Sequence, residues 1–256
     1  MLQIHTIPAF SDNYFWLFHE TGDAGAWVVD PGAEAPVDDA LEALGLKLAG
    51  ILVTHHHADH TGGVAGLVKR HGARVVGPVS AQFRAVDETV SEGDRVTCAG
   101  CDFEVFEVPG HTLDHIAYHC PSEAVLFCGD TLFAGGCGRL FEGSAAQMYS
   151  SLGKLAALPD ATRVFCAHEY TLANLAFAVR VEPDNTALAE RLEAARESRA
   201  ADRPTVPSTV ALERATNPFL RSAAPTVIAA AEARAGHALG EPESVLAEVR
   251  RWKDAS

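Results

Sequence analysis

The chain has 256 residues, 48% of them hydrophobic, and a formal net charge of −14. This composition is typical of a globular protein with one large core, or with one core and a small additional domain. The negative charge argues against general nucleic-acid binding, which needs a basic surface. No uncharged apolar stretch reaches the roughly 18–20 residues of a membrane span, so we expect no membrane partner.

The first two-thirds of the chain alternates short β-type runs with turns and helical segments. Val, Ile, Phe and Tyr are frequent in the β-type runs, and Gly, Pro and Asp separate them. The expected strands are 14–18, 26–29, 50–53, 74–76, 103–108, 116–119, 124–128 and 163–166, and the expected helices are 36–43, 62–71, 145–157 and 172–181.

The composition changes after about residue 182. Residues 184–199 are rich in Ala, Leu, Glu and Arg with helical spacing, and Ser208 is a candidate N-cap for a following helix. Two further helices, 225–235 and 242–252, each carry Pro in the first turn. We therefore expect a mixed α/β domain followed by a small all-helical domain of roughly 80 residues.

Side chains that can bind metal follow the apolar strands. His55 comes shortly after the run 50–53, His111 after 103–108, Asp130 after 124–128 and His168 after 163–166. In sheets packed against helices, the loops at one end of the strands gather the functional residues. The pattern predicts that these side chains converge at one place.

The stretch 50–63, GILVTHHHADHTGG, carries most of the candidate ligands. His55 and His57 are two residues apart, so an extended backbone places both on one face. Asp59 and His60 follow as the chain turns into a helix, and they can serve a neighbouring position. With His111, Asp130 and His168 the set has five His and two Asp, which suits two adjacent metals that share one carboxylate.

A single buried histidine is usually a core residue, so His111 or His168 alone would indicate little. The joint occurrence of these residues at strand ends favours metal binding. His56 lies on the other face of the run, and we interpret it as a supporting or structural residue. His115 is a candidate for orienting a ligand, and Asp30 is interpreted as supporting a ligand rather than only capping a turn.

The H-x-H-x-D-H motif in THHHADHTGG resembles the metallo-β-lactamase-fold superfamily. Several further segments, over essentially the whole chain, resemble glyoxalase II, the hydroxyacylglutathione hydrolase family: SDNYFWL, GDTLFAGGCGRLFEG, HEYTLANLAFA, PTVPST, NPFLR and VRRWKD. The resemblance implies an α+β fold, an αββα sandwich in residues 1–170, followed by a small helical glutathione-binding domain in residues 171–256.

The resemblance also implies the roles of the site residues. His55, His57 and His111 would bind one metal, Asp59, His60 and His168 the other, and Asp130 would bridge them. Asp59 and Asp130 are then the catalytic carboxylates, acting with a metal-bound hydroxide. The implied substrate-binding residues are Arg139, Phe141, Tyr170, Arg250 and Lys253. The family often has Lys and Tyr at the positions of Arg139 and Phe141, so the charge is kept here and a hydroxyl is lost.

The implied reaction is hydrolysis of S-D-lactoylglutathione, and of related 2-hydroxyacyl thioesters, to glutathione and D-lactate in methylglyoxal detoxification. Zinc is the favoured metal, and iron and manganese also suit the ligands. The family tends to be monomeric. The N-terminal segment lacks a basic region and a small-residue cleavage site, so we expect no signal peptide and a cytoplasmic protein. The six cysteines agree with a reducing compartment.

Other functions on the same fold remain open at this point. A mono-iron glutathione persulfide dioxygenase would use two His and one Asp and leave the second metal position unused. The motif could also belong to a β-lactamase, a lactonase, a nuclease or a non-catalytic metal-binding protein. The complete ligand set, the helical C-terminal domain and the negative charge all favour the thioester hydrolase.

Overall fold

A computed structural model describes residues 1–256, and the chain divides into two units. Unit 1 consists of Met1–Glu107 and Asp114–Gly129, and unit 2 consists of Val108–Leu113 and Asp130–Ser256. The units are thus interleaved along the chain, because a short loop of unit 2 interrupts unit 1. The functional division at residue 170 stays a prediction.

The first sheet of unit 1 has the strand order β1-β2-β3-β4-β5-β6. Strands β1 to β3 pair antiparallel, and β3 to β6 pair parallel. The strands are β1 (Leu2–Ala9), β2 (Asn13–Glu20), β3 (Gly25–Val29), β4 (Lys47–Leu52), β5 (Arg74–Pro78) and β6 (Glu88–Val90). Parallel neighbours need a crossover. Helices supply it between β3 and β4 and between β4 and β5, and a loop, residues 79–87, connects β5 to β6.

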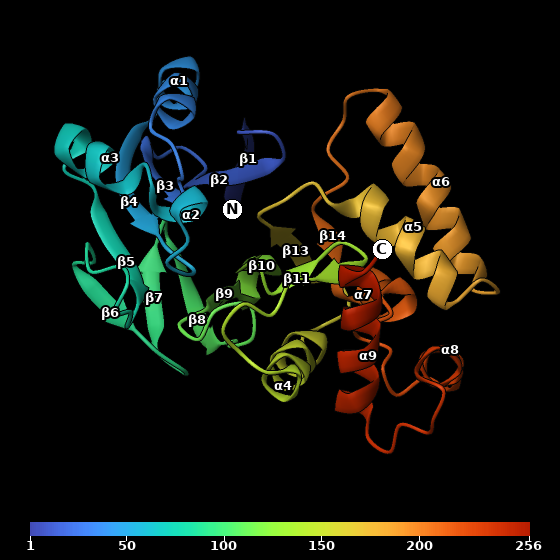
Figure 1. The fold of residues 1–256 in the computed structure, drawn as a ribbon. Coiled ribbons are helices and arrows are strands. Elements are labelled where there is room, and N and C mark those ends of the chain that lie inside the picture. Colours follow the sequence, from blue (N-terminus) through green and yellow to red (C-terminus); the bar gives the residue numbers. More distant parts are fainter. The chain divides into compact units, whose positions relative to one another are not determined.

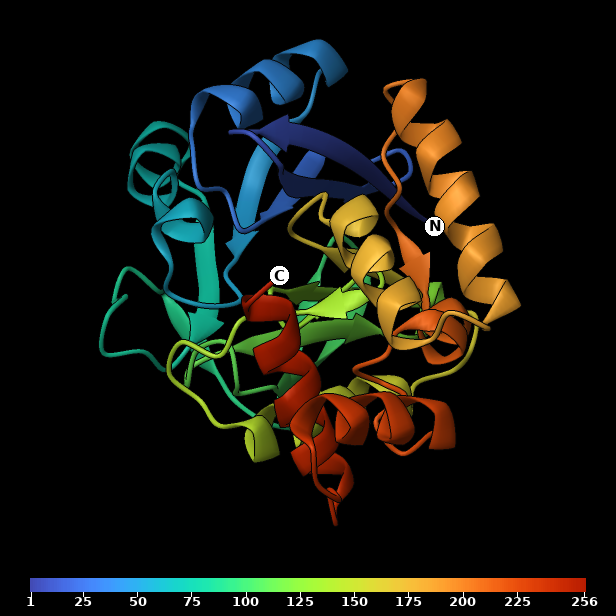
Figure 2. The ribbon, with the colours of Figure 1, turned by 45° about the vertical axis from the view of Figure 1, so that its right-hand side comes forward.

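The crossover helices of unit 1 are α1 (Ala35–Leu44), α2 (Ala58–Thr61) and α3 (Val64–His71). Helices α1 and α3 lie on the outer face of the first sheet (Figures 1 and 2). Val37 and Leu41 of α1 and Val64 and Leu67 of α3 are buried in one core with side chains of the sheet. This i, i+3/i+4 spacing of apolar residues explains why both segments form amphipathic helices.

The second sheet of unit 1 is antiparallel, with the order β10-β9-β8-β7. Its strands are β7 (Arg95–Cys98), β8 (Cys101–Glu107), β9 (Ile116–Cys120) and β10 (Val125–Gly129), with a 3-10 turn at Pro121–Glu123. Aromatic rings join the two sheets: Phe18 of β2 lies 5.2 Å from Phe127 and 5.5 Å from Phe103, between ring centroids. Unit 1 is therefore a helix–sheet–sheet sandwich.

Unit 2 is mostly helical. Its elements are β11 (Leu132–Phe133), β12 (Gly136–Cys137), α4 (Ala145–Ala156), β13 (Arg163–Cys166), α5 (Thr171–Val181), α6 (Thr186–Ala200), β14 (Ser208–Thr209), α7 (Val210–Thr216), α8 (Pro225–Ala235) and α9 (Pro242–Asp254). Helices α5 and α6 lie side by side, as do α8 and α9 (Figure 2), and Leu175, Leu188 and Leu192 pack between the first pair.

The expected strands and helices are all present, with two differences in detail. The N-cap of α7 is Thr209, whose hydroxyl accepts from the Leu212 N–H at 3.2 Å, and the expectation for Ser208 is wrong. Ser208 is buried and donates instead to Glu213. The helix expected at 62–71 begins at Val64, as α3, and the separate short helix α2 precedes it, because the Gly63 N–H bonds to the Pro31 carbonyl at 2.9 Å instead of continuing α2.

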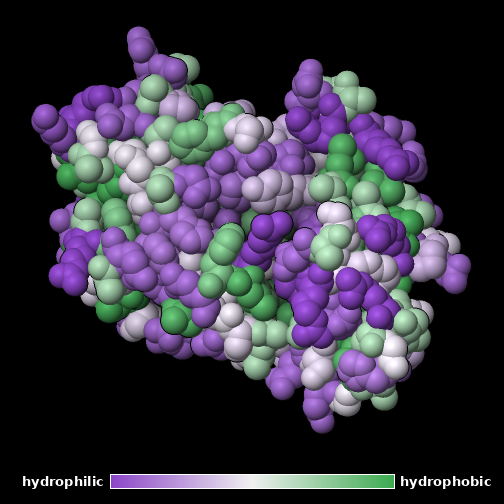
Figure 3. Space-filling view, viewed as in Figure 1, coloured by the Kyte–Doolittle hydropathy of each residue, from purple (hydrophilic) through white to green (hydrophobic).

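No helix combines the length and the apolar character that a bilayer crossing requires. On the face shown in Figure 3, hydrophilic side chains are widespread, and hydrophobic ones occur in small scattered groups.

Removing the aromatic contact between the sheets tests the sandwich. Phe18→Ala should lower the free energy of unfolding by about 3–5 kcal/mol, because the ring is fully buried and leaves a cavity. Urea unfolding followed by tryptophan fluorescence measures the change. Leu44→Ala is the control, since Leu44 is 43% exposed and should cost little. Equal losses in the two variants would contradict this packing.

Candidate metal and substrate site

Four candidate ligands of unit 1 follow the carboxyl end of β4. His55 comes three residues after the strand, His57 is the N-cap of α2, and Asp59 and His60 lie in that helix. The His55 ring centroid lies 4.8 Å from that of His57 and 4.1 Å from that of His60. The structure thus brings the three imidazoles together at the strand end, with His55 and His60 fully buried.

Asp30 orients this group from the end of β3. Its carboxylate accepts from the Thr54 N–H and hydroxyl, both at 2.7 Å, and from His60 Nδ1–H at 3.0 Å. With Nδ1 bound in this way, His60 Nε2 lies 3.4 Å from Asp59 Oδ2. Although Asp30, His55 and His60 could form a ligand group by distance alone, these contacts give Asp30 the supporting role expected for it.

Two more residues position Asp59, and the sequence indicated this role for neither of them. Asn13 Nδ2 donates to Asp59 Oδ2 at 3.0 Å, across 46 residues of chain. Gly32 lies directly against the helix that carries Asp59: a Cβ on it would stand 1.9 Å from the Asp59 carbonyl oxygen. Any side chain at residue 32 would therefore displace this ligand.

His56 and His115 lie beside the candidate ligands of unit 1. His56 Nδ1 is 3.0 Å from both carboxylate oxygens of Asp114, so its ring has a partner away from His55. His115 Nδ1–H donates to the Ile116 carbonyl at 3.0 Å, and its ring stacks on His55 with centroids 4.5 Å apart. Both positions agree with supporting roles.

The other three candidate ligands belong to unit 2. Asp130 follows β10, His168 follows β13, and His111 lies in the loop 108–113. Asp130 Oδ2 is 3.4 Å from His111 Nε2 and 3.4 Å from His168 Nε2. His111 Nδ1–H donates to the Arg139 carbonyl at 2.9 Å, which directs Nε2 toward the carboxylate.

The residues present fit divalent metal ions. Two donor atoms held about 2.0–2.1 Å from one tetrahedral metal lie about 3.3–3.4 Å apart, close to the spacings around Asp59 and Asp130. Imidazole and carboxylate ligands without a thiolate suit zinc, iron or manganese. The Nδ1 contacts of His60 and His111 are the usual support of metal-binding imidazoles.

Two aromatic side chains of unit 2 lie against the candidate ligands. The Tyr170 ring stacks on His168 with centroids 4.7 Å apart and planes 5° apart. The Phe141 ring meets His111 edge to face at 5.3 Å. Phe141 is 63% exposed and Tyr170 37% exposed, so both rings are open to a ligand.

The predicted cationic residues lie in and near α9. Arg250 is buried, and its guanidinium donates to the Cys137 carbonyl and to Asp254 Oδ1, both at 2.9 Å. Arg139 Nε lies 3.5 Å from the same carboxylate oxygen. Arg250 therefore supports the loop at residue 137 as well as carrying a charge.

Lys253 has a lowered pKa. Burial, followed by the nearby Arg250 guanidinium, lowers the pKa of the Lys253 ammonium to about 8. Its Nζ lies 5.2 Å from the centroid of the Phe177 ring. A half-buried ammonium beside a guanidinium is a favourable place for an anion, because the anion relieves their repulsion.

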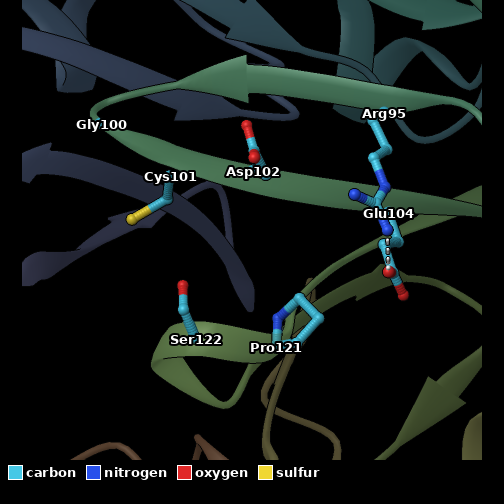
Figure 4. A pocket seen from close by; sticks show the side chains of 7 residues that line it. All are labelled: Arg95, Gly100, Cys101, Asp102, Glu104, Pro121 and Ser122. Atoms are coloured by element: carbon cyan, nitrogen blue, oxygen red, sulfur yellow. Dashed lines mark hydrogen bonds and ion pairs between the residues drawn. The ribbon is translucent and has the colours of Figure 1, made fainter.

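Thiol chemistry has little support. Burial raises the pKa of the Cys166 thiol to about 12 and also raises that of Cys137. Figure 4 shows a separate hollow in unit 1, of about 430 Å³, into which the Cys101 side chain points. Burial, and next the neighbouring Cys120, raise the pKa of Cys101 to about 11, so it is a poor nucleophile. An ion pair between Arg95 and Glu104 at 3.1 Å lines the same hollow.

Comparisons with known proteins agree with this site. Residues 10–168 match the metallo-beta-lactamase superfamily, and residues 169–256 match the hydroxyacylglutathione hydrolase C-terminus. A protein from Pseudomonas aeruginosa (strain LESB58) named hydroxyacylglutathione hydrolase is 54% identical over 256 residues, 99% of each chain.

Solved structures share the fold. ETHE1 from Myxococcus xanthus is 25% identical, with a TM-score of 0.66, over 100% of this chain and 99% of that chain. TTHA1623, solved in a di-iron-bound form, is 26% identical, with a TM-score of 0.61, over 85% of this chain and 100% of that chain. The expected fold class, a metallo-β-lactamase-type α+β sandwich with a helical C-terminal part, is confirmed. The chain belongs to the metallo-beta-lactamase superfamily and, within it, to the hydroxyacylglutathione hydrolase family, also called glyoxalase II.

Proposed function

We propose that this protein is a metal-dependent thioesterase that hydrolyses S-(2-hydroxyacyl)glutathione, chiefly S-D-lactoylglutathione, to glutathione and a 2-hydroxy acid. The observation that carries the proposal is the match of residues 169–256 to the hydroxyacylglutathione hydrolase C-terminus. That segment holds Tyr170, Arg250 and Lys253, the side chains that could bind the thiol part of the substrate. The fold alone is shared by many enzymes and would not identify the substrate.

In this proposal seven side chains hold two divalent cations, with zinc favoured. The first cation takes His55, His57 and His111, the second takes Asp59, His60 and His168, and Asp130 is shared. The spacings around Asp59 and Asp130 and the oriented imidazoles of His60 and His111 support this assignment. When bound, the two metals supply hydroxide at neutral pH and polarise the thioester carbonyl.

The other residues bind and orient the substrate. Glutathione carries carboxylates, and the net charge of −14 repels them except near a local basic cluster. Arg139, Arg250 and Lys253 form that cluster, while Tyr170 and Phe141 flank the thioester beside His168 and His111. The leaving thiolate has a parent pKa near 8.5, so it departs without a strong general acid.

A mono-iron persulfide dioxygenase is less well supported. Relatives that match the whole chain are named hydroxyacylglutathione hydrolase. We assign the metal chemistry to residues 1–170 and glutathione binding to residues 171–256. A monomer in the cytoplasm completes the proposal, and six free cysteines are consistent with that reducing compartment.

Removal of metal tests the reaction. The protein as purified should hydrolyse S-D-lactoylglutathione, measured as loss of thioester absorbance, and prolonged chelation should reduce the rate at least about 100-fold. Adding zinc, iron or manganese back should restore it. No turnover with two metals bound per chain would contradict the proposal, and oxygen consumption with glutathione persulfide would then favour the dioxygenase.

The pH dependence tests the role of Lys253. The ammonium is charged below its pKa of about 8 and neutral above it. The KM for S-D-lactoylglutathione should therefore rise roughly three- to tenfold as the pH increases through 8, because one charged contact is lost.

Lys253→Arg is the matched variant for this experiment. Its guanidinium stays charged throughout the range, so its KM should stay nearly flat between about pH 7 and pH 9. Lys253→Ala should show the high KM at every pH. Lys253 is preferred to Arg250 for this test, because replacing Arg250 also removes its bond to the Cys137 carbonyl. An identical rise in the wild type and in Lys253→Arg would reject the assignment.

A further inference from the structure

A short hairpin of unit 2 is connected to two of the candidate ligands, Asp130 and His111. Strands β11 and β12, residues 132–137, pair antiparallel directly after Asp130 and Thr131. The Gly138 N–H closes the hairpin by donating to the Thr131 carbonyl at 3.2 Å. A Cβ on Gly138 would stand 2.0 Å from the Asp130 carbonyl oxygen, so the two ends of the hairpin are in close contact.

The hairpin also controls His111. Arg139, two residues after β12, supplies the carbonyl that accepts from His111 Nδ1–H at 2.9 Å. A shift of the hairpin would therefore move the Asp130 carboxylate and rotate the His111 ring at the same time. The 3.4 Å spacing between Asp130 Oδ2 and His111 Nε2 depends on where this hairpin lies.

Helix α7 holds the tip of the hairpin through Glu213 and Asn217. Glu213 is fully buried, and its Oε2 accepts from the Gly135 N–H at 2.8 Å and from Asn217 Nδ2 at 3.0 Å. Asn217 Nδ2 also donates to the Gly136 carbonyl at 2.9 Å. Gly135 has a φ of +71°, a conformation that favours glycine, and in this turn its N–H points to the carboxylate.

The second carboxylate oxygen of Glu213 also has hydrogen-bond donors within unit 2. Oε1 accepts from Arg191 and from the Ser208 hydroxyl, and Arg191 also donates to Thr216 Oγ1 at 2.6 Å. Donors on both oxygens thus hold the carboxylate in a fixed orientation, with Oε2 directed at the Gly135 N–H.

We propose that Glu213 is a positioning residue, which together with Asn217 fixes the hairpin 132–137 and so sets Asp130 and His111 for metal binding. The inference rests on the proposed function, because it takes these two residues as metal ligands. It gives the helical C-terminal part a second task besides glutathione binding. The ligand side chains alone would then be insufficient for tight metal binding.

The test is the metal affinity of Glu213→Gln. Zinc is titrated against a competing chelator at a temperature well below unfolding, and bound metal is counted per chain. Glu213→Gln should bind zinc about ten- to 100-fold more weakly than the wild type, as is usual when the support of a ligand is lost. With metal restored, kcat should remain reduced by a larger factor than KM rises, because Lys253 lies on α9, outside the hairpin.

Glu182→Gln is the matched control. Glu182 is also a buried glutamate of unit 2, bound by Arg221 at 2.7 and 2.9 Å and by Thr226, and none of these partners belongs to the hairpin. The Glu182→Gln variant should have a lower unfolding midpoint and the zinc affinity and kcat of the wild type. Asn217→Ala, which keeps the Glu213–Arg191 ion pair, should reproduce the weaker zinc binding if Glu213→Gln folds poorly.

Two results would overturn the proposal. One is a folded Glu213→Gln or Asn217→Ala with wild-type zinc affinity and kcat. The other is an equal loss of zinc affinity in Glu182→Gln, which would indicate general loosening of unit 2. Failure of the proposed function would look different, because the wild type itself would bind zinc and fail to hydrolyse the thioester.

Discussion

The hydrogen bonds to imidazole Nδ1 are the interactions on which the site depends. A histidine presents Nε2 to a cation in one orientation only when an acceptor holds its Nδ1–H. His60 has the Asp30 carboxylate, and His111 has the Arg139 carbonyl. In each case Nε2 then lies 3.4 Å from a carboxylate oxygen, of Asp59 or of Asp130. Without these acceptors the rings could rotate, and binding a metal would cost the entropy of fixing them.

The candidate ligands could be proposed from the sequence because their signal is local. His55 to His60 lie within a few residues of one another, and His111, Asp130 and His168 each follow an apolar strand. Strand ends share one edge of a sheet, so the pattern indicates a site without a structure. The helices could be predicted equally well, since apolar periodicity, Pro in the first turn and Gly after the last turn are signals that act over short distances.

The supporting contacts of Asn13 and Glu213 could not be predicted, because their partners are far apart in the chain. Asn13 meets Asp59 across 46 residues, and Glu213 meets Gly135 across 78. Neither pair has a spacing that a pattern search would find. The error at Ser208 has the same origin: a hydroxyl before a helix is normally a cap, but burial beside Glu213 gives Ser208 another partner. Tertiary contacts, and not local sequence preferences, therefore determine the partners of Asn13, Glu213 and Ser208.

The protein combines a strongly acidic chain with a local cationic cluster and two groups of candidate ligands. Unit 1 carries the candidates His55, His57, Asp59 and His60, and unit 2 carries His111, Asp130 and His168. The central claim is that both groups serve one two-metal centre. Anomalous diffraction from crystals grown with zinc tests it directly. We predict two peaks about 3.5–4 Å apart, with Asp130 between them. A single peak, or two peaks far apart with each beside one group alone, would contradict it.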